Sequence, residues 1–185
     1  MRFFAVALCI VFALVGCSRL QVAEVDASTG YFPGADKAPI VLKKPVDLDA
    51  RNELIVVGKS DFLVGQLKNM NYFKEVITID ELEKRIVQAN LVDQIPSVRD
   101  KLGLSKAARA YRPFLWMHTE GRGEGTAQYV QFVLTDAATL EDYFVTETHL
   151  DFMWKGVNDR SNWYPMFNSL IDYVKQNSTI YRKKR

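Results

Sequence analysis

The sequence predicts an α/β fold: a single domain with a mixed sheet and elements in the order β-α-β-α-(α)-β-β-β-α. Three observations lead to this prediction. Residues 54–57 form a short, wholly apolar run that passes directly into an amphipathic segment, as in a β-α-β unit whose sheet is covered on both faces. Residues 114–149 contain alternating apolar and polar side chains around two turns, as in antiparallel hairpins. The span 49–178 suits one hydrophobic core.

The first half of the domain is expected to alternate strands with helices. After the strand at 54–57, residues 60–71 place apolar side chains at helical spacing, and residues 73–78 return to a strand pattern. The helical positions expected to face the core are Leu63, Leu67 and Met70.

A second helix is expected to begin at Asp80, because Glu83 follows it at the spacing of a capping box. Leu82, Ile86 and Ala89 would then face the core. Ser97 and Ser105 are expected to start two further short helical turns.

The second half is expected to be three strands and a helix. Residues 114–118 form the first strand, residues 129–134 return from a glycine-rich tip, and residues 143–149 follow a second turn. The final helix, 163–177, carries apolar side chains at helical spacing: Trp163, Phe167, Leu170, Ile171 and Val174.

Residues 1–17 have the layout of a secretory signal. Arg2 precedes the apolar run 3–15, which as a helix reaches about 20 Å, less than the roughly 30 Å of a hydrocarbon core. The run ends in Leu14-Val15-Gly16-Cys17, which resembles the lipobox of bacterial lipoproteins. The resemblance implies cleavage after residue 16, a diacylglycerol thioether on Cys17 and acylation of the new amine. The alternative is an ordinary signal peptide with a coincidental cysteine.

The lipobox has consequences for location and chemistry. Each buried acyl CH₂ contributes about 0.8 kcal/mol, so several chains would anchor the protein to a membrane permanently. In such lipoproteins Asp after the cysteine favours the inner membrane; Ser18 stands here, which implies the outer membrane, on its periplasmic side. Because Cys9 lies in the removed segment, Cys17 would be the only cysteine left. No disulfide framework, Cys-ligated metal or catalytic thiol is therefore expected.

The segments that flank the domain are expected to be flexible. Residues 17–48 are interpreted as the acylated cysteine and a tether, since Ser, Gly and Pro recur there, and such a chain spans roughly 30 Å. Residues 179–185 are interpreted as a basic tail, either a solvated end or a contact for anionic lipid headgroups.

The charge balance argues against polyanionic partners. Of the 24 Lys and Arg residues, one lies in the signal and four in the last four positions, which leaves 19 against 22 Asp and Glu. Neither nucleic acid nor nucleotide is therefore expected as a partner.

The stretch 54–61, L-I-V-V-G-K-S-D, imitates the end of a nucleotide-binding P-loop. A P-loop needs a first glycine five residues before Gly58, but that position is Glu53, and the residues between form a strand. We therefore expect Gly58 to make a strand-to-helix turn and Ser60 or Asp61 to cap the helix.

The two histidines, His118 and His149, each have a glutamate two residues away, Glu120 and Glu147. Neighbouring strands would bring them into a metal site, but the strand at 129–134 is expected to lie between them. Nothing resembles a Ser/His/Asp or paired-carboxylate arrangement. The sequence therefore predicts no catalytic residue, no metal and no cofactor, and the protein is expected not to be an enzyme.

Three surfaces are candidates for partner contact. Strand parity places Trp116, His118, Tyr129 and Gln131 on one sheet face, opposite Leu115, Met117, Val130, Phe132 and Leu134; this face either contacts a partner or is covered by a helix. The hairpin tip 121–125 is a second candidate, and the aromatic segment 151–165 is the third unless its tryptophans pin it to the core. The candidate contact residues are Arg122, Glu124, Trp116, His118, Trp154 and Asn158.

The order of elements resembles the small periplasmic domains of the TolB amino-terminal region, CsgG-type proteins and the lipoprotein LpoB. The corresponding features are the strand 54–57, Asn71-Tyr72-Phe73, the strand 113–118, Asp136-Ala137-Ala138-Thr139 and the helix that ends at Asn177. The sequence departs from that pattern at Leu140, where those domains usually have Gly, which puts the geometry of this turn in doubt.

This resemblance implies an envelope accessory protein that binds another protein. Together with the lipobox, it predicts an outer-membrane lipoprotein whose periplasmic domain recognises an envelope protein partner. The alternative is a small-molecule or glycan-binding domain, possibly hydrolytic, which would need a deep pocket near His118 and His149 or near Trp154.

Overall fold

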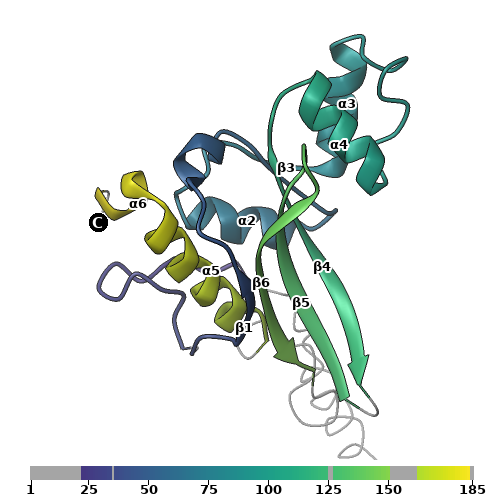
Figure 1. Cartoon of the computed structure of the whole chain (residues 1–185). Coiled ribbons are helices and arrows are strands. Elements are labelled where there is room, and N and C mark those ends of the chain that lie inside the picture. Colours follow the sequence, from purple (N-terminus) through teal and green to yellow (C-terminus); the bar gives the residue numbers. More distant parts are fainter. Residues whose placement is uncertain (1–21, 35, 125–126, 151–161, 184–185) are drawn as a thin grey trace, which may run out of the picture.

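A computed structural model describes residues 22–34, 36–124, 127–150 and 162–183. Its centre is a six-stranded sheet in the order β1-β6-β5-β4-β2-β3 (Figure 1). The pairs β2·β3 and β2·β4 are parallel, and the pairs β4·β5, β5·β6 and β1·β6 are antiparallel. The strands are β1 (Ile40–Lys43), β2 (Ile55–Val57), β3 (Val76–Thr78), β4 (Leu115–Glu124), β5 (Ala127–Asp136) and β6 (Glu141–His149). The predicted single-domain mixed α/β fold is confirmed.

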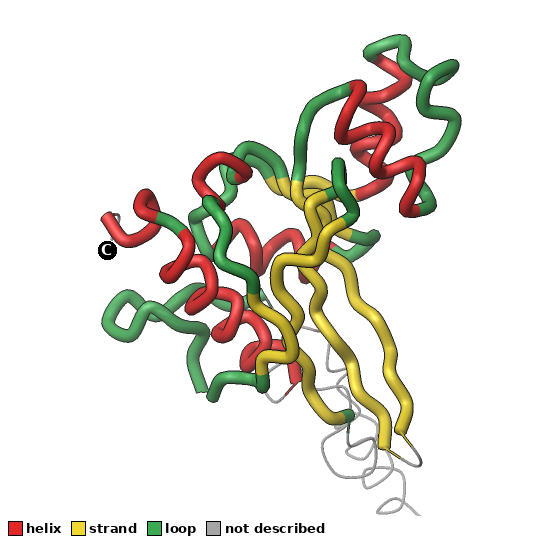
Figure 2. The backbone as a smooth tube through the Cα atoms, in the orientation of Figure 1, coloured by secondary structure: helices red, strands yellow, loops and turns green. Residues whose placement is uncertain are grey.

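Helices cover both faces of the sheet and create two cores. They are the 3-10 helix η1 (Leu48–Arg51), α2 (Asp61–Asn69), α3 (Ile79–Gln88), α4 (Lys101–Ala110), α5 (Tyr164–Asn177) and α6 (Thr179–Lys183). The larger core lies between the sheet and α2 and α5, and the smaller one lies under α3 and α4. Figure 2 shows α3 and α4 gathered at one end of the sheet, while β4, β5 and β6 extend away from them. None of the helices in the described ranges is both long and apolar enough to cross a membrane.

The strand-turn-helix joint at 54–61 forms as expected. β2 is wholly buried, and the Ser60 side chain accepts a hydrogen bond from Leu63 N–H at 3.3 Å. Lys59 is a surface residue whose Nζ lies 3.7 Å from an oxygen of Asp80. The joint therefore serves the architecture of the sheet.

Two predicted helix starts are wrong. The N-cap of α3 is Thr78, whose hydroxyl accepts from Glu81 N–H at 3.2 Å, while Asp80 forms an ion pair with Arg99 at 2.9 Å. Ala89, expected in the core, is exposed at the helix end. The two turns expected at Ser97 and Ser105 are one helix, α4, capped by Asp100; Ser105 lies inside it. The capping-box spacing of Asp80 and Glu83 pointed to the wrong N-cap of α3, because the local sequence does not show where the preceding strand ends.

The interpretation of 17–48 as a flexible tether is corrected for residues 22–34 and 36–48. Phe32 is 2% exposed, and Asn168 of α5 accepts from its N–H at 2.8 Å and donates to its C=O at 3.2 Å. Residues 40–43 are the edge strand β1, paired with β6. Leu48, which begins η1, is fully buried. The folded part of the chain therefore starts at least as early as Val22.

The interpretation of 179–185 as a free tail is corrected in the same way for residues 179–183. These residues form α6, and Tyr181 is 2% exposed in the larger core. Its amino end is held by Asp49, which accepts hydrogen bonds from Thr179 N–H at 2.8 Å and Ile180 N–H at 3.2 Å. Arg182 and Lys183 thus belong to a docked helix.

Candidate functional site

The face of β4, β5 and β6 opposite the larger core, here called the outer face, carries the site residues predicted from strand parity. Its side chains form four cross-strand rows, from the end near α4 to the β4–β5 hairpin tip. The rows are Trp116, Thr135 and Asp142; His118, Val133 and Val145; Glu120, Gln131 and Glu147; and Arg122, Tyr129 and His149. The prediction that Trp116, His118, Tyr129 and Gln131 share a face is therefore confirmed.

The first row is covered at Trp116 by α4. Trp116 is 9% exposed and belongs to the smaller core, together with Leu104 and Ala108 of α4. Its ring stacks on the imidazole of His118, with centroids 3.8 Å apart and planes 17° apart. The interpretation of Trp116 as a surface contact is thus corrected. α4 covers this residue, and its indole ring packs against the imidazole of His118.

His118 is held in one orientation by a short polar chain. Its Nε2 lies 3.2 Å from Thr135 Oγ1, and that hydroxyl lies 2.6 Å from Asp142 Oδ1. Because a carboxylate only accepts, Thr135 donates to Asp142 and His118 Nε2–H donates to Thr135. Burial lowers the pKa of His118, and Lys101 adds to this effect, while Glu120 and Asp142 oppose it.

This chain does not activate a nucleophile. A nucleophilic hydroxyl must pass its proton to the imidazole, whereas the Thr135 proton points to Asp142. Thr135 is also only 2% exposed, so a substrate has no access to it. The His–Thr–Asp chain therefore fixes the sheet side chains in place, and it gives the hydrolytic alternative no support.

The two histidines do not form a metal site with each other. β5 lies between β4 and β6, so His118 and His149 are two strands and two rows apart. No group of three or more metal-ligating side chains occurs in the part of the chain that the structure describes.

The third and fourth rows, here called the distal rows, contain a connected polar and aromatic network. Arg122 lies 3.2 Å and 3.3 Å from the two carboxylate oxygens of Glu147, and Gln131 donates to Glu147 at 2.9 Å. The Arg122 guanidinium also lies 4.5 Å from the centre of the Tyr129 ring, which meets His149 edge-on at 5.2 Å. Each member is therefore oriented by at least one neighbour before any partner arrives.

The distal rows reach solvent. The side chains of Glu120 and Arg122 are 46% and 41% exposed, His149 is exposed, and the other three are partly exposed. The helices that cover the outer face, α3 and α4, lie at the opposite end of the sheet (Figure 1). An aromatic, a guanidinium and an amide on a rigid strand surface are groups favoured at protein interfaces.

Sequence reasoning identified part of this site. It selected Arg122 and His118. Strand alternation placed Tyr129 and Gln131 on this face without their being selected as contact residues, and Glu147 and His149 were not assigned to it. Cys17, Trp154 and Asn158 lie outside the described residues, and so does the side chain of Glu124.

The main clefts of the described chain lie away from the histidines. One of about 630 Å³ lies between α2 and α3, and others border residues 25–34 and the Lys43–Pro45 turn. None of these clefts is lined by residues of the distal rows.

No protein-family model matches the sequence, and comparison with curated proteins gives no match. Solved structures similar to this chain include the C-terminal domain of LpoB from Salmonella enterica, at a TM-score of 0.35 and 15% identity, covering 55% of this chain and 84% of that one. The same domain from Escherichia coli gives 0.34 and 15%, covering 54% and 83%. A lipoprotein from Neisseria meningitidis gives 0.29 and 12%, covering 53% and 81%. LpoB, which the order of elements resembles, is thus among the structural neighbours of this chain.

Proposed function

We propose that this protein is an outer-membrane lipoprotein, anchored through Cys17 on the periplasmic side, whose domain is an accessory module that binds another cell-envelope protein. The distal rows are the proposed contact surface. The sequence at 14–17 supports the anchor, and the preorganised network of Arg122, Tyr129 and Glu147 supports recognition of a protein.

The observation that carries the proposal is the accessibility of that network. Ion pairs at an exposed surface contribute only about 0–1 kcal/mol to folding, so stability alone gives little reason to align the five side chains of this network. A protein interface gives a reason, because orientation before binding reduces the entropy lost when the complex forms.

The contact surface is tested by photo-crosslinking in intact cells. A benzophenone amino acid replaces Tyr129 or His149 in one pair of variants, and exposed Lys84 on α3 in the control. We expect the same adduct from both distal-row positions and its absence at position 84. Adducts that are equally frequent at all three positions, or absent at both distal positions, contradict the proposed surface.

The anchor is tested separately with Cys17→Ala. We expect the parent chain to carry acyl mass and to sediment with outer membranes, and the variant to lose both properties. A parent chain without acyl mass that still sediments with membranes contradicts the lipid anchor.

A further inference from the structure

The sheet has a free edge at β3, apart from the distal rows. Among the described residues β3 is the terminal strand, so one row of its backbone groups has no described strand beside it. Glu75 C=O accepts from Ile55 N–H of β2 at 3.0 Å, and strand residues alternate sides. Val76 N–H and C=O and Thr78 N–H therefore point away from β2, toward the open edge.

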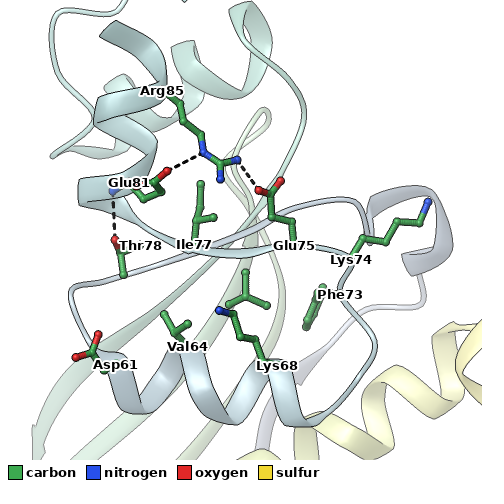
Figure 3. A pocket seen from close by; sticks show the side chains of 11 residues that line it. Asp61, Val64, Lys68, Phe73, Lys74, Glu75, Ile77, Thr78, Glu81 and Arg85 are labelled. Carbon is green, nitrogen blue, oxygen red and sulfur yellow. Dashed lines mark hydrogen bonds and ion pairs between the residues drawn. The ribbon is translucent and has the colours of Figure 1, made fainter. Parts of the chain in front are cut away.

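This edge is the floor of a groove with two helical walls. The groove has a volume of about 630 Å³ and is lined by α2 on one side and α3 on the other. Figure 3 shows Asp61, Val64 and Lys68 of α2 along one wall, and Glu81 and Arg85 of α3 along the other. Peptide groups at the base of such a groove fit an extended polypeptide, which supplies the missing row of donors and acceptors.

The charges of the α3 wall are already neutralised. Arg85 contacts Glu75 at 2.6 Å and Glu81 at 3.2 Å, and Arg112 contacts Glu75 at 2.8 Å. Burial raises the pKa of Glu75, but Arg85 and Arg112 outweigh it and hold this pKa below its usual value. The charged groups of this wall are therefore paired with one another, and the wall contributes little to the choice among partner segments.

The charges of the α2 wall are not neutralised by ion pairs within the described residues. Asp61 and Lys68 are both exposed, and Val64 lies between them, partly buried. Figure 3 shows Asp61 on the Thr78 side of the groove, Lys68 arising from α2 on the Phe73 side, and Val64 between them. The wall thus presents an acid, an apolar group and a base in that order.

We propose that the β3 edge binds an extended segment of a partner protein with the pattern basic, any, apolar, any, acidic, paired antiparallel to β3. Antiparallel pairing is favoured because it is slightly more stable per residue than parallel pairing. The first and fifth residues of a strand lie about 13 Å apart on one face, and Asp61 and Lys68 are about 10 Å apart along the helix, a difference of about 3 Å that the long Lys and Glu side chains of the segment span. A basic first residue meets Asp61, the apolar third covers Val64, and the acidic fifth meets Lys68.

The test uses the full chain in detergent and a fluorescent peptide, acetyl-Thr-Lys-Thr-Val-Thr-Glu-Thr-amide. The matched control peptide exchanges its Lys and Glu. We expect the first peptide to bind about fivefold or more tightly than the second, because two exposed ion pairs become two like-charge contacts. N-methylation of the peptide backbone at Val should abolish binding, since it removes a donor to the β3 edge.

Protein variants give the reciprocal result. The double variant Asp61→Lys with Lys68→Asp should reverse the preference between the two peptides, and Lys84→Asp, outside the groove, should leave it unchanged. Equal binding of both peptides, or unimpaired binding of the methylated one, overturns the proposal. Self-association of the parent chain that Lys68→Asp abolishes also overturns it, because a second copy then occupies the groove. The distal rows take no part in this assay, so either surface can fail alone.

Discussion

At the scale of single residues, Asp49 connects parts of the chain that are far apart in the sequence. Its carboxylate accepts from the hydroxyls of Ser178 and Thr179, from the N–H groups of Thr179 and Ile180, and from Tyr72 OH at 3.2 Å. Burial raises the pKa of Asp49, but these hydrogen bonds outweigh it and hold the pKa well below its ordinary value of 3.8. One side chain thus caps α6 and ties it to η1.

We predict that Asp49→Asn lowers the free energy of unfolding by about 2 kcal/mol at neutral pH, the usual range for losing hydrogen bonds to a charged group. Because the folded pKa is depressed, the ionised form stabilises the fold above about pH 4, and this contribution is lost as the pH falls toward the folded pKa. Urea titrations at pH 7 and pH 3 should therefore show a difference between parent and variant that shrinks in acid. Asp93→Asn, at an exposed position, is the control; an equal loss there contradicts this role.

Leu140 is the second residue whose role depends on one local property. It has φ = 61°, in the left-handed region, so it keeps the backbone conformation that glycine adopts most easily. The Asp136 carboxylate fixes this turn by accepting from Ala138 N–H at 2.8 Å and Thr139 N–H at 3.3 Å. Leu140 therefore adopts the left-handed backbone conformation of this turn without being a glycine.

We predict that Leu140→Gly is more stable than Leu140→Ala by about 1 kcal/mol, because both lose the leucine contacts and only alanine keeps the steric cost of positive φ. Thermal unfolding of the two variants measures this difference. The same pair of substitutions at Lys84, inside α3, should give the opposite order, since glycine is unfavourable in a helix. Equal stabilities at position 140 would mean that the turn has another conformation.

At the scale of elements, the β3–α3 joint shows how a strand end sets a helix start. Thr78 is both the last residue of β3 and the N-cap of α3. Asp80 lies in the first turn, where it forms ion pairs with Arg99 and Lys59. The parallel pairing of Val57 with Thr78 fixes where the strand stops, so the cap falls two residues before the position that the acidic spacing indicates.

We predict that Thr78→Ala costs about 1 kcal/mol of folding free energy and that Thr78→Ser restores most of it, since serine keeps the capping oxygen. Asp80→Ala should cost less than 0.5 kcal/mol, roughly the worth of exposed ion pairs. Chemical denaturation of the three variants ranks these effects. A larger loss of folding free energy for Asp80→Ala than for Thr78→Ala would show that Asp80, and not Thr78, caps α3.

At the scale of the whole molecule, local pattern predicted the elements from β2 to α5 except α4, which was expected as two short turns, and non-local contacts added the rest. The apolar triplet 40–42 stands among prolines and becomes β1 only because β6 offers it an edge. α6 has five residues and depends on Asp49 and on burial of Tyr181. The candidate site was likewise predicted in part. Strand alternation predicted that Trp116 and Tyr129 share a face, but it does not show that α4 covers only one end of that face.

We predict that Asn168→Ala lowers the free energy of unfolding by about 2 kcal/mol, because the buried Phe32 N–H and C=O lose their partner together. Residues 22–34 should then exchange amide hydrogens faster, and limited proteolysis should cut there first. Asn69→Ala, which removes a single hydrogen bond to Ala23 C=O, should have a smaller effect. Unchanged exchange in residues 22–34 would show that α5 does not hold this segment.

Because residues 22–34 belong to the fold, little chain is left between the domain and the lipid anchor that we propose at Cys17. Val22 packs over Gly65 of α2, where a Cβ would approach it to 2.6 Å, and Ala23 N–H donates to Gln66 at 3.1 Å. With the acyl anchor that we propose at Cys17, only the four residues 18–21 link it to Val22, and these five Cα–Cα steps reach at most about 18 Å. The domain would then diffuse laterally in a thin layer against the bilayer, where confinement raises its effective concentration toward membrane-embedded proteins. Proteins whose docking surfaces lie deeper in the periplasm would have to approach the membrane to meet it.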